Sequence, residues 1–447
     1  MSRILNEAKK RYNDFIISNN LESHEHQKYG VLWCLDRECN SNPYLDNKNG
    51  GFLADEMGLG KTIMMLALIK VNILARSTLI VVPPPLLRQW EIKIENLLKV
   101  KPIVVYGYGK KNLKIENSSI ILTTYGNLNS SLPNIKEKKF DRVIFDEAHH
   151  LKNKNSECYK NALDIDSKIT WLITGTPLQN KMEDIYNLGN LLNLNKSSIE
   201  KNFEKFKKIC ILHRKKANAN IILPEVKEFI INVKWETTIE KEMLVEMMTK
   251  IDADKGNLLL HIIQQRKMCI SPNSLNENFK ELYNVSDKLF NGTKNSKSKI
   301  NEVVNIMKKN KNNGKKKMLF CHFRKEMDTI EKELEKIGYN KIEKIDGRIT
   351  EKRRNEIFLE ASDDDDKVFI MQIQSCSEGL NLQMFSEVYF VSPHWNPCVE
   401  EQAIARCHRL GQRQEVHVYK FKMENSIEYY IKSVQDAKIE LRRGLLF

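Results

Sequence analysis

Short apolar runs alternate with longer polar stretches along most of this 447-residue chain, and the alternation limits the folds it can adopt. The runs are rich in β-branched residues, which is typical of buried strands. They fall at 78–83, 102–107, 119–125, 142–146 and 169–174 in the first half, and at 317–323, 342–347, 368–374, 387–392 and 415–421 in the second. Strands that alternate with helices form parallel sheets covered on both faces, so we predict an α/β fold with two such blocks.

The region between the two blocks has a different character. Residues 185–295 are rich in lysine and in helix-forming residues, with one further strand candidate at 228–233. A chain of this length exceeds one typical domain. We therefore predict a first α/β lobe at 1–200, a helical region at 201–295 and a second α/β lobe at 296–447.

Composition narrows the class of protein. Lys and Arg number 72 against 58 Asp and Glu, a formal net charge of +14, which favours a polyanionic partner such as nucleic acid. The chain contains no run of 18 apolar residues and no signal-peptide core, so we expect an intracellular protein without a membrane span. The nine cysteines include no C-x-x-C pair, which argues against a zinc ribbon or a disulfide framework.

The stretch GGFLADEMGLGKT at 50–62 is the strongest chemical signal. Gly58 and Gly60 allow backbone N–H groups to approach an anion at the start of a helix. Lys61 is placed to reach the β- and γ-phosphates, and the Thr62 hydroxyl to bind Mg²⁺. The strict pattern has glycine where this chain has Asp55, so a glycine-rich turn before an ordinary helix is the alternative interpretation of the stretch alone.

A pair of acids supplies the second half of a hydrolytic site. The apolar run 143–145 leads directly into Asp146 and Glu147. At the carboxyl end of a strand, Asp146 can hold Mg²⁺ and Glu147 can orient or deprotonate the attacking water. Together with the glycine loop, these residues predict a nucleoside triphosphatase.

Phosphoryl transfer also needs positive charge near the γ-phosphate. The segment QAIARCHRLGQ at 402–412 offers Arg406 and Arg409, which would share one face if the segment is helical. We predict that these two arginines act as arginine fingers. The alternative is two surface arginines on a helix.

Six motifs in order carry a resemblance to a known family: GFLADEMGLGKT, DEAHHLKN, LITGTPLQN, EGLNLQ, PHWNP and QAIARCHRLGQ. Together they resemble the Swi/Snf-type ATPases of helicase superfamily 2, which translocate on double-stranded DNA. The resemblance extends from about residue 21 to residue 421. It implies two RecA-like lobes with ATP bound between them, and a nearly bare motor without accessory reader domains.

The resemblance assigns roles to individual residues. Gln27 matches the glutamine that reads adenine, and Asp55 belongs to the nucleotide loop. A coupling role between hydrolysis and lobe movement falls on Thr174, Gly175, Thr176 and Gln402. DNA-facing positions are Gln89, Trp90, Thr124, Lys152, Arg324, Arg348, Asn381 and Trp395. Arg266 and Cys269 match the stretch that marks the family's helical protrusion.

Two departures from the family pattern bear on DNA coupling. Ser375, Cys376, Ser377 and Glu378 stand where the family usually has Ala-Gly-Gly-x, and His150 stands where arginine is common. Both changes put the phosphate contacts of these segments in question.

The predicted function is an ATP-dependent translocase on duplex DNA, acting as a monomer with ATP and Mg²⁺, that displaces or slides bound protein such as nucleosomes. We expect it in the nucleus or in a cytoplasmic compartment that contains DNA. The alternatives are a strand-separating helicase on RNA or single-stranded DNA and an ATP-gated clamp with negligible turnover.

Overall fold

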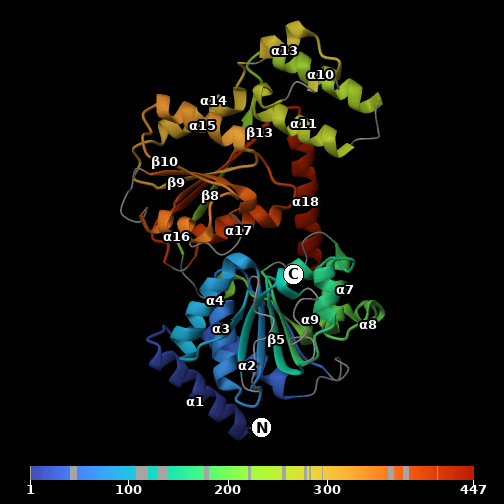
Figure 1. Cartoon of the computed structure of the whole chain (residues 1–447), viewed down its shortest axis with the longest axis vertical. Coiled ribbons are helices and arrows are strands. Elements are labelled where there is room, and N and C mark those ends of the chain that lie inside the picture. The colour runs from blue at the N-terminus through green and yellow to red at the C-terminus, as the bar shows by residue number, and fades with distance from the viewer. Residues whose placement is uncertain are drawn as a thin grey trace. The chain divides into compact units, whose positions relative to one another are not determined.

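The computed structural model describes residues 2–40, 48–106, 119–128, 138–175, 181–219, 223–253, 258–275, 279–280, 283–293, 295–360, 367–375, 382–409 and 411–446. The chain divides into two compact units, Met1–Ile222 with Arg442–Phe447, and Leu223–Leu441 (Figure 1). Each unit is built on one parallel sheet with helices on both faces, which confirms the predicted α/β class. The three segment limits that we gave above remain a prediction.

The sheet of the first unit has seven strands in the order β3-β4-β2-β5-β6-β1-β7. Its strand pairs are parallel, and β2 and β4 are buried along their whole length. The strands are β1 (Asn49–Leu53), β2 (Thr78–Val82), β3 (Ile103–Val105), β4 (Ile120–Thr124), β5 (Phe140–Asp146), β6 (Ser167–Ile173) and β7 (Ile211–Leu212). The strands β5, β6 and β1 are neighbours, so their carboxyl ends meet at one place on the sheet edge.

Helices cover both faces of this sheet. One core cluster joins the sheet to α1 (Ser2–Ser18), α2 (Glu25–Cys39), α3 (Lys61–Val71) and α4 (Leu87–Lys93). The other joins it to α6 (Glu157–Leu163), α7 (Met182–Asn190), α8 (Lys196–Lys201) and α9 (Phe203–Cys210). In Figure 1 the blue helices and the green helices of this unit lie on opposite sides of β5.

The sheet of the second unit has six strands in the order β10-β11-β9-β12-β13-β8, again with parallel pairs. The strands are β8 (Val226–Val233), β9 (Lys317–Cys321), β10 (Ile342–Ile345), β11 (Val368–Gln372), β12 (Glu387–Phe390) and β13 (Val416–Met423). Successive residues of β9 enter different cores: Leu319 packs into one cluster and Phe320 into the other. This two-sided burial is what a continuous apolar run in a parallel sheet requires.

The helices of the second unit also form two layers. The larger core includes α10 (Thr238–Ala253), α11 (Leu258–Ile270), α13 (Asp287–Thr293), α14 (Ser298–Lys309), α15 (Arg324–Lys336) and the start of α18 (Ile427–Leu446). The smaller core includes α16 (Glu351–Glu360) and α17 (Pro397–Cys407). Among the helices that the structure describes, none combines the length and the apolar character that crossing a membrane requires.

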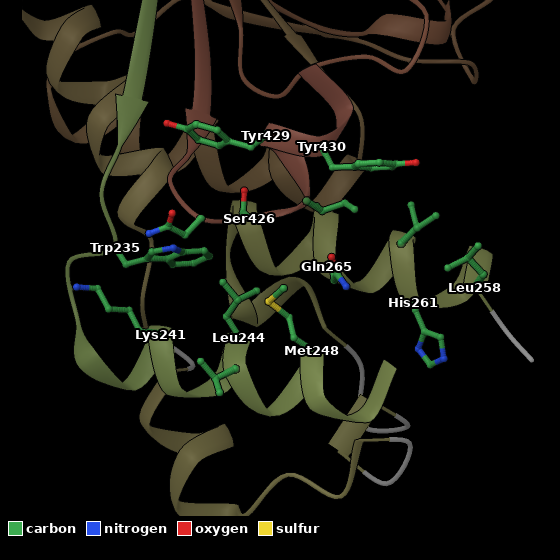
Figure 2. A pocket seen from close by; sticks show the side chains of 14 residues that line it. Trp235, Lys241, Leu244, Met248, Leu258, His261, Gln265, Ser426, Tyr429 and Tyr430 are labelled. Carbon is green, nitrogen blue, oxygen red and sulfur yellow. The ribbon is translucent and has the colours of Figure 1, made fainter. Parts of the chain in front are cut away.

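An apolar pocket of about 860 Å³ lies between α10, α11 and the start of α18 (Figure 2). Figure 2 shows Trp235, Met248, Tyr429 and Tyr430 around it. The residues that line it include none of the predicted nucleotide, coupling or DNA-facing residues. Pocket size alone therefore does not locate the active site of this protein.

The ten predicted strands are confirmed, and the strand candidate at 228–233 lies within β8. Two strands of the first sheet were not predicted. β1 (Asn49–Leu53) has the sequence NGGFL, whose glycines indicated the turn rather than a strand, and β7 (Ile211–Leu212) is only two residues long. Both flank the nucleotide loop, so they matter for the site.

Candidate active site

The predicted phosphate loop connects β1 to α3, and α3 begins at Lys61. Gly58 and Gly60 have φ angles of +93° and +84°, the left-handed conformation that favours glycine. A Cβ atom at Gly60 would lie 2.3 Å from Nε2 of Gln27, so a side chain there would displace Gln27. The loop ends at the first turn of a helix, where backbone N–H groups and the helix dipole favour an anion.

Lys61 folds back over its own loop. Its Nζ donates to the backbone oxygens of Asp55 at 2.6 Å and Glu56 at 3.3 Å. Burial lowers the pKa of Lys61, while nearby carboxylates, first among them Glu147, oppose that shift. A Cβ atom at Gly175 would lie 3.6 Å from Lys61 Nζ, so the structure brings Gly175 of the predicted coupling motif beside the phosphate-loop lysine.

Asp146 is the last residue of β5, and its carboxylate is held from two directions. Trp90 Nε1 donates to Oδ2 at 2.7 Å, and the backbone N–H of Glu147 donates to Oδ1 at 3.0 Å. Tyr125 fixes the backbone here, because its hydroxyl donates to the Asp146 carbonyl at 2.6 Å. Burial, and next the charge of Glu147, raise the pKa of Asp146 to about 6.

The backbone of Glu147 has a φ of +51°, which is unusual for a residue with a side chain. A left-handed conformation costs roughly 1–2 kcal/mol for such a residue, and strain of this kind clusters at functional sites. Its Oε2 lies 3.3 Å from Nδ1 of His149, an ion pair when that histidine is protonated. The two neighbouring acids still interact, because the charge of Glu147 contributes to the raised pKa of Asp146.

The acceptors at this edge fit Mg²⁺. Asp146 keeps further lone pairs on both carboxylate oxygens after accepting one hydrogen bond at each. Thr62 lies in the first turn of α3, next to Lys61. One carboxylate and one hydroxyl, together with substrate phosphates and waters, make the kind of site that Mg²⁺ uses with nucleotides.

Asp55 has a different role from the predicted nucleotide contact. Its side chain is 0% exposed, and both of its oxygens accept hydrogen bonds from Arg214, at 3.0 Å from Nε to Oδ1 and by a second bond from Nη2 to Oδ2. This bidentate pair holds the buried carboxylate against Arg214.

Gln27, the predicted adenine contact, lies at the edge of the phosphate loop. It is in the first turns of α2, and its Nε2 donates to the Leu59 carbonyl at 3.4 Å. The ring of His26 bonds the same carbonyl through Nε2 at 3.1 Å. Two adjacent side chains thus tie α2 to the loop.

The first unit's predicted DNA-facing residues are not equally accessible. Gln89 and Lys152 are half-buried, whereas Trp90 and Thr124 are 0% and 1% exposed. The side chains of Trp90 and Thr124 are therefore buried in this conformation, and their contact with DNA stays a prediction. Trp90 orients Asp146. The ring of His150 stacks on Tyr125 with a centroid separation of 5.1 Å.

The predicted arginine fingers belong to the second unit. Arg406 lies in the last turn of α17, but the helix ends at Cys407, so Arg409 is outside it. The premise that both share a helix face is wrong. The two side chains are nevertheless close enough to interact, since burial, and next the positive charge of Arg406, lower the pKa of Arg409. Gln402 lies on the same helix and is buried.

Two of the second unit's predicted DNA-facing residues, Arg324 and Arg348, share one carboxylate. Asp346 accepts from Arg348 Nη2 at 2.6 Å and pairs with Arg324 Nε at 3.2 Å, and hydrogen bonds from Arg348 are the leading cause that lowers the pKa of Asp346. Both arginines are exposed. Two exposed guanidinium groups thus share one carboxylate, and the three side chains together carry a net positive charge.

Trp395 is half-buried and lies edge-on to Tyr430, at 6.1 Å between ring centroids. Its carbonyl accepts from Lys438 Nζ at 3.1 Å. Arg266 of α11 donates to the carbonyl of Pro393 at 3.1 Å, so the helical region supports the loop that carries the tryptophan. Thr176 and Asn381 lie outside the described residues, as do positions 376–378 of the altered segment.

Comparison with known families agrees with this geometry. The SNF2-related domain family matches residues 26–324, and the helicase conserved C-terminal domain family matches residues 298–411. Since the first match covers more than half of the chain, the chain belongs to the SNF2-related family. It is therefore a helicase-like ATPase, and ATP is its nucleotide.

Individual relatives have similar sequences over most of the chain. An uncharacterized ATP-dependent helicase of Mycoplasma genitalium is 31% identical over 96% of this chain and 42% of its own length. A chromodomain-helicase-DNA-binding protein 3 homolog of Caenorhabditis elegans is 27% identical over 96% of this chain and 27% of its own length. A protein named probable global transactivator of Orgyia pseudotsugata multicapsid polyhedrosis virus is 28% identical over 93% of this chain and 89% of its own length.

The chain thus spans less than half the length of the first two relatives. Among solved structures, the Sulfolobus solfataricus SWI2/SNF2 ATPase core in complex with dsDNA is similar to it. The TM-score is 0.43 and the identity 21%, over 95% of this chain and 93% of that one.

Proposed function

We propose that this chain is a DNA-stimulated ATPase that moves along duplex DNA and displaces or slides proteins bound to it. The proposal goes beyond family membership, which establishes the ATPase. It is supported by the placement of the hydrolytic residues and by the two surface arginines and the tryptophan of the second unit.

One observation carries the proposal. Lys61, Asp146 and Gly175 lie at the carboxyl ends of the three neighbouring strands β1, β5 and β6, and Glu147 follows directly. Ligands of open parallel sheets bind at this edge. A Cβ atom at Gly175 would lie 3.6 Å from Lys61 Nζ, so the coupling motif lies beside the phosphate-loop lysine. In this proposal, a change at the γ-phosphate is transmitted to the segment that begins at Thr174.

The roles of these residues follow from their chemistry. Lys61 holds the β- and γ-phosphates as a point charge, and Glu147 orients or deprotonates the attacking water. Thr62 and Asp146 would hold Mg²⁺, which neutralises charge that develops on the phosphates. Trp90 keeps Asp146 in position, and Gln27 at the loop's edge reads the adenine.

The second unit completes the site in this proposal. Closure of the two units on ATP brings Arg406 and Arg409 to the γ-phosphate, and hydrolysis releases them. Thr174, Gly175, Thr176 and Gln402 couple that closure to movement. The protein advances along DNA because the two units hold the duplex tightly in turn.

Duplex DNA is proposed to contact both units. Gln89 and Lys152 contribute from the first; Arg324, Arg348, Asn381 and Trp395 contribute from the second. Arginine contacts to phosphates give affinity without sequence preference, and an aromatic ring adds a contact to the sugar or base surface. The name of one relative from Arabidopsis thaliana, a CHD3-type chromatin-remodeling factor, makes nucleosomal DNA the first protein-bound DNA to test.

An ATPase titration with duplex DNA, single-stranded DNA, RNA and nucleosomal DNA at one stated salt concentration tests the proposal. We expect duplex DNA to raise kcat at least about tenfold, a barrier change of about 1.4 kcal/mol. Lys61→Ala should hydrolyse no ATP above background with any of them. Stronger stimulation by RNA or single strands would instead indicate strand separation, and negligible turnover with every nucleic acid would indicate an ATP-gated clamp.

A further inference from the structure

Arg214 lies beside the phosphate loop, where it contacts Asp55. It follows β7, which pairs with β1 as the edge strand of the first sheet. Its guanidinium group makes the bidentate pair with Asp55, and its Nη1 donates to the carbonyl of His26. One side chain therefore bonds two elements: the loop that holds the phosphates and the helix that carries Gln27.

The backbone around Arg214 extends this contact along the loop. The N–H of Ala54 donates to the Leu212 carbonyl at 2.8 Å, and the N–H of Glu56 donates to the Arg214 carbonyl at 2.9 Å. Further on, the N–H of Lys216 donates to Glu56 Oε2 at 2.7 Å. The segment thus continues the parallel pairing of β7 beyond the strand and holds the backbone of residues 54–56 in position.

The surface of α2 leaves room for the guanidinium group. A Cβ atom at Gly30 would lie 2.8 Å from Arg214 Nη2, and the ring of Tyr29 lies 5.7 Å from Arg214 Cζ. Nη2 also lies 3.6 Å from the sulfur of Met64 on α3. The planar fork of arginine can make bonds in two directions at once, which the single ammonium of a lysine cannot reproduce.

The far end of α2 is fixed separately. Glu38 accepts from Arg142 Nε and Nη2, each at 2.6 Å, and from Trp171 Nε1 at 2.8 Å. All three side chains are buried. With this end fixed, the contact of Arg214 with His26 acts together with the bonds of His26 and Gln27 to the Leu59 carbonyl in holding the first turn of α2 against the loop.

We propose that Arg214 is a positioning residue that links base recognition by Gln27 to the alignment of the phosphate loop. The inference rests on the proposed nucleotide roles of Gln27 and Lys61. Arg214 is not one of the predicted nucleotide contacts, and in this proposal it acts through Asp55 and His26. It makes adenine binding and phosphate alignment depend on each other. A nucleotide with another base therefore loses the contact with Gln27 and is also held with its phosphates less well aligned.

Steady-state hydrolysis of ATP and GTP by three variants tests this inference. Arg214→Lys keeps the charge but loses the fork, and Arg214→Gln loses both. We expect KM for ATP to rise about tenfold in Arg214→Gln, as for loss of one charged hydrogen bond, with kcat changed less than about threefold. The preference for ATP over GTP should fall by a similar factor, and Arg214→Lys should fall between Arg214→Gln and the natural protein.

The third variant, Gln27→Ala, makes the test specific. If Arg214 acts through Gln27, then Gln27→Ala combined with Arg214→Lys should discriminate ATP from GTP no worse than Gln27→Ala alone, because interacting residues are not additive. Arg37→Gln is the matched control. Arg37 also joins α2 to the segment before β7, through the Ile209 carbonyl at 3.2 Å, but it does not bond Asp55 or His26. Its KM and base preference should not change.

Several outcomes would overturn the inference. It fails if Arg214→Lys leaves both KM and base preference unchanged, if the two losses add in the double variant, or if Arg214→Lys lowers kcat and the unfolding temperature without affecting base preference. The last result would make Arg214 purely structural. If Lys61→Ala still hydrolyses ATP, the proposed function fails instead, so the two failures can be told apart.

Discussion

The two predicted halves of the hydrolytic site differ in the charges around their cations. In the first unit Lys61 lies among carboxylates, with Glu147, Asp55 and Asp146 all opposing the effect of burial on its pKa. In the second unit Arg409 lies beside another cation, and the charge of Arg406 adds to the effect of burial. Neighbouring carboxylates therefore favour the charged form of Lys61, whereas the neighbouring guanidinium group disfavours the charged form of Arg409.

This difference suggests a division of labour. A site in which carboxylates surround the lysine can bind ATP together with Mg²⁺ without help from the second unit. Two neighbouring guanidinium groups gain most when the negative charge of the γ-phosphate comes between them, because that charge relieves their mutual repulsion. We therefore interpret the first unit as the part that binds ATP, and the second as the part that makes hydrolysis fast.

The largest effect that can break this comparison is expected from Arg406→Ala. An arginine finger accounts for about 10³–10⁵ in kcat in related enzymes, so we expect a loss in this range with duplex DNA present. The Kd for ATP should stay within about threefold, because binding depends on the first unit. Rapid-quench hydrolysis and equilibrium binding of a fluorescent ATP analogue measure the two quantities. If Arg406→Ala weakens binding as much as it slows hydrolysis, the division of labour is wrong.

A smaller loss of hydrolysis is expected from Asp146→Asn. This variant tests whether the buried Asp146 charge destabilises the first unit when no nucleotide is bound. Burial and Glu147 raise the pKa of Asp146 to about 6 in the folded protein, above its ordinary value of 3.8. A raised acid pKa means that the folded state binds more protons than the unfolded one. Without nucleotide, stability should therefore fall as the pH rises from about 4 to about 6 and then level off.

Removing the charge should reverse that loss. At pH 7.5 without nucleotide, we expect Asp146→Asn to raise the free energy of unfolding by roughly 1–2 kcal/mol, a few degrees in Tm, while hydrolysis falls at least about 100-fold. Calorimetry at pH 4.5 and 7.5 gives the control, since the stabilisation should be small at the lower pH. A variant that is less stable than the natural protein at pH 7.5 would show that the buried charge is compensated in the folded state.

Much of the fold could be predicted because its signals are local. The strands from β2 to β6 are apolar runs between polar helices, and periodicity is enough to find them. The strands β1 and β7 were not predicted, for different reasons: two of the five residues of β1 are glycines, and β7 has only two residues. Their positions depend on pairing with β6 and with each other, and sequence pattern carries no information on that pairing.

The site shows the same limit. Lys61, Asp146 and Glu147 follow from motif chemistry, since each type of residue suits one task in phosphoryl transfer. Arg214 does not follow, because it lies 159 positions from Asp55 and outside the motifs quoted above. The end of α17 at Cys407 could not be foreseen either, since no glycine or proline marks it. Long-range pairing and local backbone geometry decide these details.

The most direct test of the two-part site is the distance between the units in each nucleotide state. Spin labels at Lys160→Cys in α6 and Lys332→Cys in α15, in a Cys39→Ser background, report that distance by pulsed electron resonance, with the singly labelled chains as controls. We expect a broad distribution without nucleotide that narrows to one short distance when ADP, a transition-state analogue of the γ-phosphate and duplex DNA are added together. Arg406→Ala should weaken that narrowing. A distribution that stays the same in every nucleotide state would contradict a site shared between the two units.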